Sequence, residues 1–234
     1  MKFGVITFPG SNCDHDMIHV LREVTGHQVD EIWHREEMLR DFTKDDCAVL
    51  PGGFSYGDYV RAGAIAHLAP IMSAVKQHAG NGGLVWGICN GFQILCESHL
   101  LPGALVRNAQ QKFIGKDIYL RVETTDSLIT NRYEKGQVLR IPIAHAEGRF
   151  IADEKTTEAI EANDQVLFRY CDESGDITDA ANVNGSTNNI AGICDKTRRV
   201  FGMMPHPERA SEEALGNTDG LTMFQSMIGG TQFA

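Results

Sequence analysis

A cysteine stands between two glycines in Gly87-Ile88-Cys89-Asn90-Gly91, where an apolar stretch gives way to helical spacing. Residues 83–88 predict a buried strand, and the spacing of the apolar residues from Phe92 onward predicts one face of a helix. A nucleophile in such a turn is held in strained backbone geometry that small neighbours permit, beside the first free N–H groups of the helix. Because those N–H groups favour a thiolate, the pattern predicts a nucleophilic Cys89.

A candidate base lies far downstream in Pro205-His206-Pro207-Glu208. His206 and Glu208 are two residues apart, so in extended backbone their side chains point to the same side. Glu208 can then orient the imidazole through one ring nitrogen while the other nitrogen faces the sulfur, as in a Cys-His-Glu triad. The alternative is that Cys89 is a buried core cysteine and His206 a loop residue bonded to backbone. The elbow glycines and this segment together favour the catalytic interpretation.

Acyl chemistry also needs donors for an oxyanion, and adjacent glycines follow the short apolar stretch 47–50. Gly52 and Gly53 lie at the carboxyl end of that predicted strand, where a bare N–H can approach a reacting carbonyl. The N–H groups of Gly53 and Asn90 are the predicted pair of donors. The alternative is an ordinary turn, since Pro-Gly pairs mark turns in many chains.

The composition limits the class of protein. With 234 residues, 42% of them hydrophobic, the chain is long enough for one full core, and we predict a single domain over residues 1–234. A net charge of -10 argues against a nucleic-acid or anionic-membrane partner. Met1-Lys2 leads directly into a predicted strand, which leaves no signal peptide, and no apolar run reaches the ~20 residues of a membrane span. We therefore expect a cytoplasmic protein.

The cysteines and histidines give no metal pattern. The six cysteines show no Cys-x-x-Cys spacing, which favours a reducing compartment over a disulfide framework. His15 and His19 are four residues apart on the predicted first helix, but two ligands without a third are typical of a solvated helix. No metal site is predicted.

The order of elements indicates the fold class. Segments of helical spacing, notably 14–24 and 60–78, alternate with strand-like stretches at 3–8, 28–33, 46–50 and 83–88. This alternation predicts an α/β fold with a mainly parallel, open sheet flanked by helices. Ser11 or Asn12 is the expected N-cap of the first helix. Beyond residue 100 the pattern becomes strand-rich, at 116–123, 137–143, 165–170, 190–194 and 200–204.

These elements predict where the candidate residues meet. Gly53, Cys89 and His206 each follow a predicted strand. Because ligands of open α/β sheets bind outside the carboxyl ends of the strands, one crevice can unite the three.

The chain resembles the class I, triad-type glutamine amidotransferases in three motifs, which follow in the family's order: Gly52-Gly53, Gly87-x-Cys89-x-Gly91 and Pro205-His206-Pro207-Glu208. Three longer stretches, 8–14, 53–64 and 86–95, are similar to those of the family's purine-biosynthetic glutaminase subunits. The likeness runs from residue 3 to about Arg209. It implies a single flavodoxin-like α/β domain that hydrolyses glutamine through a cysteine thioester.

The resemblance also implies roles for individual residues. The catalytic residues would be Cys89 as nucleophile, His206 as general base and acid, and Glu208 as its orienting partner. The oxyanion donors would be Gly53 and Asn90. Substrate-binding residues would be Gly52, Phe54, Gln93, His145 and Glu147. For His145, a strand histidine with an internal hydrogen-bond partner is the open alternative.

For partners and cofactors, the resemblance implies a larger ATP-dependent synthetase subunit together with a small accessory subunit. The synthetase would use the ammonia to convert formylglycinamide ribonucleotide to its amidine. ATP and Mg²⁺ are expected on that partner, with no cofactor in this chain, which has no Walker-type motif. Gln110 replaces a serine that is common in the family ahead of Lys112-Phe113. Residues 229–234 match none of the family's motifs, and we expect them to form a flexible tail.

Three other functions fit parts of the pattern. An amidotransferase of the guanylate or anthranilate type would share the triad, but the stretch 54–58 argues against it. A stand-alone cysteine hydrolase of the protease-like or chaperone-like α/β class would share the elbow, but not a base in a late Pro-His-Pro-Glu segment. A non-catalytic regulatory subunit would have no need for an intact Cys89, His206 and Glu208.

Overall fold

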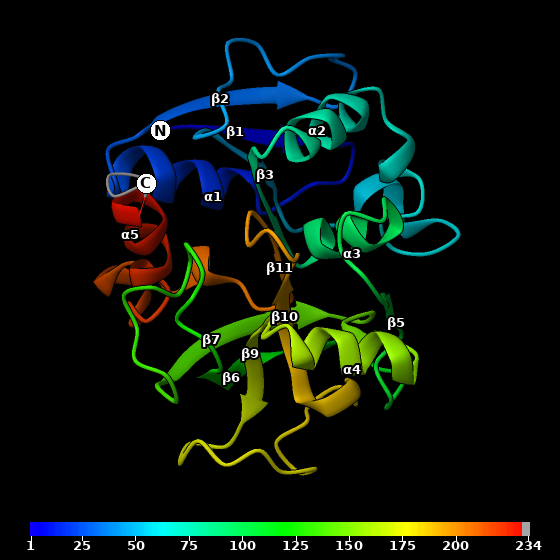
Figure 1. The fold of residues 1–234 in the computed structure, drawn as a ribbon, viewed down its shortest axis with the longest axis vertical. Helices are drawn as coiled ribbons and strands as arrows, with labels where there is room; N and C mark the ends of the chain where they lie inside the picture. The colour runs from blue at the N-terminus through cyan, green and yellow to red at the C-terminus, as the bar shows by residue number, and fades with distance from the viewer. Residues whose placement is uncertain (231–234) are drawn as a thin grey trace.

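The predicted α/β fold with a central sheet is confirmed by the computed structural model, which describes residues 1–230 (Figure 1). Within this range, nine strands form one sheet in the order β2-β1-β3-β4-β11-β10-β9-β6-β7. Their bounds are β1 (Lys2–Thr7), β2 (Gln28–Trp33), β3 (Cys47–Leu50), β4 (Leu84–Ile88), β6 (Ile114–Val122), β7 (Val138–His145), β9 (Val166–Cys171), β10 (Ile190–Cys194) and β11 (Val200–Met203). A separate antiparallel pair consists of β5 (Ala104–Val106) and β8 (Arg149–Ile151).

The sheet is parallel in the half that bears the candidate residues. The pairs β2-β1, β1-β3, β3-β4 and β4-β11 are parallel, whereas the pairs from β11 through β10, β9 and β6 to β7 are antiparallel. The parallel half has the strand order of a flavodoxin-like doubly wound sheet, in which ligands bind at the carboxyl ends of the strands. This geometry brings the segments after β1, β3, β4 and β11 to one edge.

Helices cover both faces of the parallel half. They are α1 (Asp14–His19), which continues as a π-helical turn over Val20–Val24, α2 (Ile71–Gly80), α3 (Asn90–Glu97) and α5 (Leu221–Gly230). Helix α4 (Glu154–Ala162) lies in the other half of the molecule, near β9 and β5 (Figure 1). Figure 1 shows α2 and α3 on one side of β3 and α1 and α5 on the other. Because both faces are covered, every residue of β3 and β4 is buried, which explains their unbroken apolar runs. Trp86 of β4 packs against Phe224 of α5, with ring centroids 5.1 Å apart.

Several predicted boundaries were wrong. The helix expected over 60–78 begins only at Ile71, since Val60 and Gly63 have φ of 75° and 80° and cannot continue a right-handed helix. Cys13, not Ser11 or Asn12, occupies the N-cap of α1, and the Ser11 hydroxyl instead accepts the N–H of Phe8 at 3.0 Å.

The second half of the chain holds helices that the sequence patterns did not predict. Helix α4 was missed, although Asp153 caps it by accepting the N–H of Thr156 at 2.7 Å. Helix α5 was missed as well. The first two residues of the expected tail, 229 and 230, belong to this helix, and residues 231–234 lie outside the described residues. Within residues 1–230, none of the helices combines the length and hydrophobicity of a membrane span.

The turn between β4 and α3 depends on glycine. A Cβ at Gly91 would lie 1.9 Å from the carbonyl oxygen of Leu50, and a Cβ at Gly87 would lie 2.6 Å from the backbone of Gly91. No side chain fits these gaps, so the first turn of α3 packs directly on the backbone at the end of β3.

Gly91→Ala should therefore lower the free energy of unfolding by about 1–3 kcal/mol or more, because β3 and α3 must move apart. Gly80→Ala is the matched control, since position 80 lies in α2, has open space within 4 Å and needs no positive φ. Urea denaturation of both variants makes the comparison. Equal stability of the two would contradict the close packing at Gly91.

Candidate active site

Cys89 lies in a strained turn at the start of α3. Its φ of 51° and ψ of -104° are rare for a residue with a side chain. The turn is fixed from both sides, since the Cys89 N–H donates to Met203 at 2.8 Å and its carbonyl accepts the N–H of Gln93 at 3.2 Å. The Cys89 sulfur lies 3.9 Å from the carbonyl oxygen of Ala144. The backbone thus presents the thiol beyond the carboxyl end of β4, as the glycine spacing predicts.

His206 and Glu208 form a buried pair just beyond β11. His206 Nδ1 lies 2.6 Å from Glu208 Oε1, and the two residues are 1% and 2% exposed. Burial opposes a charged imidazole, but the Glu208 carboxylate and the nearby thiols of Cys89 and Cys13 hold the pKa of His206 well above its usual value. His206 Nε2 is buried and has no hydrogen-bond partner in the described part of the chain. The free nitrogen is therefore available to a reacting group.

One cavity of about 170 Å³ brings these groups together. Its lining includes four residues that the sequence predicted for the site, namely Gly53, Phe54, Cys89 and His206. Five further lining residues were not among the predicted catalytic, oxyanion or substrate-binding residues: Asn12, Cys13, Phe113, Ala144 and Arg209. Phe54 and Phe113 are 43% and 55% exposed, so they stand at the mouth of the cavity.

The orientation of the Gly52-Gly53 peptide is fixed by hydrogen bonds from the start of α1. The Gly52 carbonyl accepts the N–H groups of Asn12 and Cys13 at 3.4 and 3.2 Å. Because N–H and C=O of a trans peptide point in opposite directions, the Gly53 N–H faces away from α1. Gly53 has φ of 148°, and a Cβ there would lie 2.7 Å from Ser11 Cα. The second predicted donor, the N–H of Asn90, belongs to the first turn of α3, where no intrahelical partner exists.

Gln93 and Glu147 form a hydrogen-bonded network beside the cavity rather than part of its wall. The Gln93 side chain donates to the Glu147 carbonyl at 2.6 Å and accepts from Asn90 Nδ2 at 2.9 Å. Asn90 Oδ1 in turn accepts the N–H of Ser55, and the Glu147 carboxylate accepts the N–H of Ala62 at 3.1 Å. These bonds tie the segment 54–62 to the elbow.

His145 belongs to the same inner layer. It is 3% exposed, and its Nδ1 lies 3.0 Å from Asn108 Oδ1, which also accepts the N–H of Gly148. Asn108 Nδ2 donates to the carbonyls of Lys112 and His145, so the network assigns the proton to His145 Nδ1. Burial, aided by the charge of His206, lowers the pKa of His145 to about 4. His145 is therefore neutral at physiological pH.

Cys13 and Arg209 are the main residues that sequence reasoning missed. Arg209 Nη2 donates to the Cys13 sulfur at 3.2 Å, and the Cys13 thiol lies 3.1 Å from Asn12 Oδ1. The one available signal was position, because Cys13 follows the carboxyl end of β1, where ligands of such sheets collect. Arg209 adjoins the Pro-His-Pro-Glu motif, but only the fold shows that it faces the start of α1.

The ligand atoms of Cys13, His206 and Glu208 lie within 4.8 Å of one another, a distance compatible with a bound metal ion. The hydrogen bonds of these three residues indicate a role other than metal binding. His206 and Glu208 are bonded to each other, and Cys13 accepts a hydrogen bond from a cation, Arg209. Two of the three groups are therefore paired with each other and the third with a cation, so they are not free to coordinate a metal ion together.

The comparisons with known proteins agree with this geometry. Residues 1–227 match the model of the CobB/CobQ-like glutamine amidotransferase domain. The chain belongs to this glutamine amidotransferase family. It is 55% identical to a Koribacter versatilis protein, with 98% of each chain covered, and 54% identical to one from Methanosarcina barkeri, with 97% covered. Both relatives carry the name phosphoribosylformylglycinamidine synthase subunit PurQ.

Solved structures show the same glutamine amidotransferase architecture. A chain in the structure of PurLQS from Thermotoga maritima is 42% identical and superposes with a TM-score of 0.85 over 97% of both chains. A putative GMP synthase protein from Thermoplasma acidophilum, at 18% identity and a TM-score of 0.60 over 98% of this chain and 92% of that chain, shares the fold.

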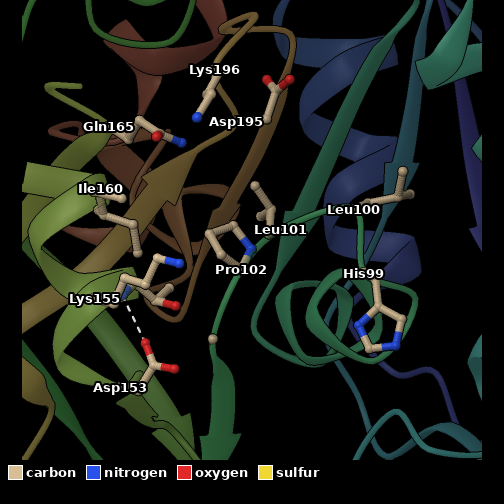
Figure 2. A pocket seen from close by; sticks show the side chains of 13 residues that line it. His99, Leu100, Leu101, Pro102, Asp153, Lys155, Ile160, Gln165, Asp195 and Lys196 are labelled. Atoms are coloured by element: carbon tan, nitrogen blue, oxygen red, sulfur yellow. Dashed lines mark hydrogen bonds between the residues drawn. The ribbon is translucent and has the colours of Figure 1, made fainter. Parts of the chain in front are cut away.

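A wider hollow of about 710 Å³ lies away from the amidotransferase residues, between the segment after α3 and helix α4 (Figure 2). Figure 2 shows Lys155 and Gln165 on one side and Leu101 and Pro102 on the other. Asp153 here caps α4, and Gln165 donates to the Cys194 carbonyl at 2.7 Å. Some of its polar groups are thus already used in structural bonds, and no candidate catalytic residue lines it.

Iodoacetamide should alkylate Cys89 faster than the other five cysteines. Burial raises the pKa of each of those five thiols, to about 11 for Cys171 and about 12 for Cys194. Cys89 opens to a cavity, has a histidine beside it and lies at a helix N-terminus. Peptide mapping after brief labelling measures the site of modification. Label found first on Cys13, which lines the same cavity, would contradict the assignment.

Proposed function

We propose that this chain is the glutaminase subunit of phosphoribosylformylglycinamidine synthase, which hydrolyses glutamine to glutamate and ammonia. The observation that carries the proposal is the single cavity in which Cys89 faces the buried His206-Glu208 pair. Full-length identity of 55% to a protein named as that subunit supports the choice of pathway.

In this mechanism the Cys89 thiolate attacks the side-chain amide carbon of glutamine. The tetrahedral oxyanion accepts hydrogen bonds from the N–H groups of Gly53 and Asn90. Protonated His206 gives its Nε2 proton to the leaving nitrogen, so that ammonia departs and a glutamyl thioester remains. A water molecule, deprotonated by His206, then attacks the thioester carbon and releases glutamate and the thiol. Glu208 stabilises the imidazolium in both steps.

Two groups of residues would bind and frame the glutamine. Gly52 and Phe54 are proposed to contact it through backbone; Phe54 lines the cavity, and Gly52 directly precedes the lining residue Gly53. Gln93, His145 and Glu147 are proposed to act from the surrounding network, where their hydrogen bonds hold the segment 54–62 and the end of β7 in place. Neutral His145 adds no charge beside the imidazolium of His206.

The ammonia would pass to a larger synthetase subunit, which would hold ATP and Mg²⁺ and amidate formylglycinamide ribonucleotide. The relative in the PurLQS structure supports such a partner, and we extend the proposal to a small accessory subunit. This chain would need no cofactor and no metal, since the thiol and the imidazole supply the chemistry. We place the complex in the cytoplasm.

Cys89→Ser should abolish glutamine-dependent synthesis by the reconstituted complex and leave ammonia-dependent synthesis largely intact, because added ammonia bypasses the thioester. Cys47→Ser is the matched control, since Cys47 is fully buried in β3. Amidine formation is measured with glutamine and then with ammonium as nitrogen donor. If the Cys89 variant lost both activities while the complex stayed assembled, Cys89 would not be the nucleophile.

Glu208→Gln should lower the pKa of His206 and slow thioester formation, because the amide no longer stabilises the imidazolium. The equivalent change in a serine triad costs about 10⁴ in turnover, an upper guide since a thiol ionises more readily than a hydroxyl. Glu212→Gln is the control, because it breaks a half-exposed His-Glu contact of 2.7 Å with His19.

The stability that the His206-Glu208 contact contributes depends on pH, and the raised pKa of His206 fixes the direction of that dependence. Since the folded-state pKa of His206 is raised, its contact with Glu208 stabilises the fold fully below the usual histidine pKa and is lost as the pH rises through the raised value. Titration of the His206 ring proton by NMR, with and without Glu208, measures the change. An unchanged pKa and an unchanged glutaminase rate in Glu208→Gln would remove Glu208 from the mechanism.

A further inference from the structure

We propose that Arg209 binds the α-carboxylate of glutamine, an inference that rests on the proposed function. Arg209 lines the cavity that holds Cys89 and His206, and it comes from the turn directly after Glu208. An amino-acid substrate carries a carboxylate at the end remote from its reacting amide. A guanidinium is the side chain best suited to hold that group, because its donors match the two carboxylate oxygens.

The guanidinium is held in place by Asp16, outside the cavity, and by Cys13, in the cavity lining. Its Nε donates to Asp16 Oδ2 at 3.1 Å and its Nη2 to the Cys13 sulfur at 3.2 Å. Within residues 1–230, Nη1 has no hydrogen-bond partner. The Arg209 side chain is 36% exposed and that of Asp16 is 45% exposed. The Arg209 guanidinium is thus already oriented by these two hydrogen bonds and still has N–H groups free to bind a ligand.

The charge around the cavity favours an anion. Among the nine residues that line it, the ionisable groups are two thiols, His206 and Arg209, and no carboxylate is present. Asp16 offsets part of the Arg209 charge from its position outside the lining. The one permanently charged side chain of the lining, Arg209, is positive. A substrate carboxylate bound there would therefore meet no carboxylate of the lining.

The length of glutamine suits this placement. Four carbon–carbon bonds separate its amide carbon from its carboxylate carbon, which is roughly 5 Å in an extended chain. With the amide carbon at Cys89, the carboxylate must reach another wall of the same small cavity. One wall of that cavity is formed by Arg209 together with Asn12 and Cys13, which lie at the start of α1.

Two alkylating agents of similar size test the charge directly. Iodoacetate is an anion and iodoacetamide is neutral, and both react with Cys89 by the same displacement of iodide. We expect Arg209→Met to reduce the ratio of the iodoacetate rate to the iodoacetamide rate at Cys89 by about tenfold, whereas Arg209→Lys keeps most of it. Peptide mapping confines the measurement to Cys89. Arg22→Met, which removes an arginine that pairs with Glu31, is the control.

Kinetics of the reconstituted complex test the substrate itself. Loss of a charge-assisted hydrogen bond should raise the KM for glutamine by about 10- to 100-fold in Arg209→Met, with a smaller effect on kcat. Arg209→Gln serves if the methionine variant does not fold, because an amide can still bond to Asp16. The inhibition constant of the product glutamate should rise in parallel.

Unequal outcomes separate the explanations. If both reagents slowed equally, or KM stayed unchanged in the charge-removing variants, Arg209 would be only a structural residue and the inference would fail. If the wild-type complex failed to hydrolyse glutamine although Cys89 preferred iodoacetate, the proposed function would fail and the anion site would stand.

Discussion

The backbone of α3 passes so close to the end of β3 that only glycine fits at position 91, where a Cβ would meet the Leu50 carbonyl oxygen at 1.9 Å. This contact fixes where the helix begins. Because β4 must turn into α3 within two residues of Gly87, Cys89 takes a positive φ that it would not adopt in a free chain. The packing of two glycines thus sustains the strain that exposes the thiol at the edge of the sheet.

The chemistry at this edge depends on charges that the interior would otherwise disfavour. Burial alone would keep the His206 imidazole neutral, yet Glu208 at 2.6 Å and two thiols favour the protonated ring. Such a pair is costly to bury unless its geometry is good. The 3₁₀ turn that begins at Pro207 supplies that geometry, and the N–H of His206 is anchored to the Pro142 carbonyl at 2.9 Å.

A layer of amides connects the separate loops of the site. Asn90 joins the elbow to Ser55, Gln93 joins it to Glu147, and Asn108 holds His145 and Gly148. The functional residues come from segments nearly 200 positions apart, so each loop must be held by contacts with the next. Buried hydrogen bonds of this kind rigidify a site, since breaking one of them leaves a buried polar group unpaired.

Sequence by itself determined the local features of this protein. The apolar runs predicted the strands of the parallel half. The spacing around Cys89 and between His206 and Glu208 indicated an elbow and an oriented base. These features depend only on residues that are close together in the chain, so the sequence alone can show them. It missed α4 and α5, and it extended the second helix back to residue 60, where positive φ at Val60 and Gly63 prevents a helix.

Only the tertiary structure decided which residues share the cavity. Cys13 and Arg209 lie 196 positions apart and contact each other at 3.2 Å, whereas Gln93 and Glu147, expected at the substrate, bond to their neighbours beside it. No short pattern encodes such pairs. They arise because parallel strands place the segments after β1 and β11 at one edge, and that register is a property of the assembled sheet.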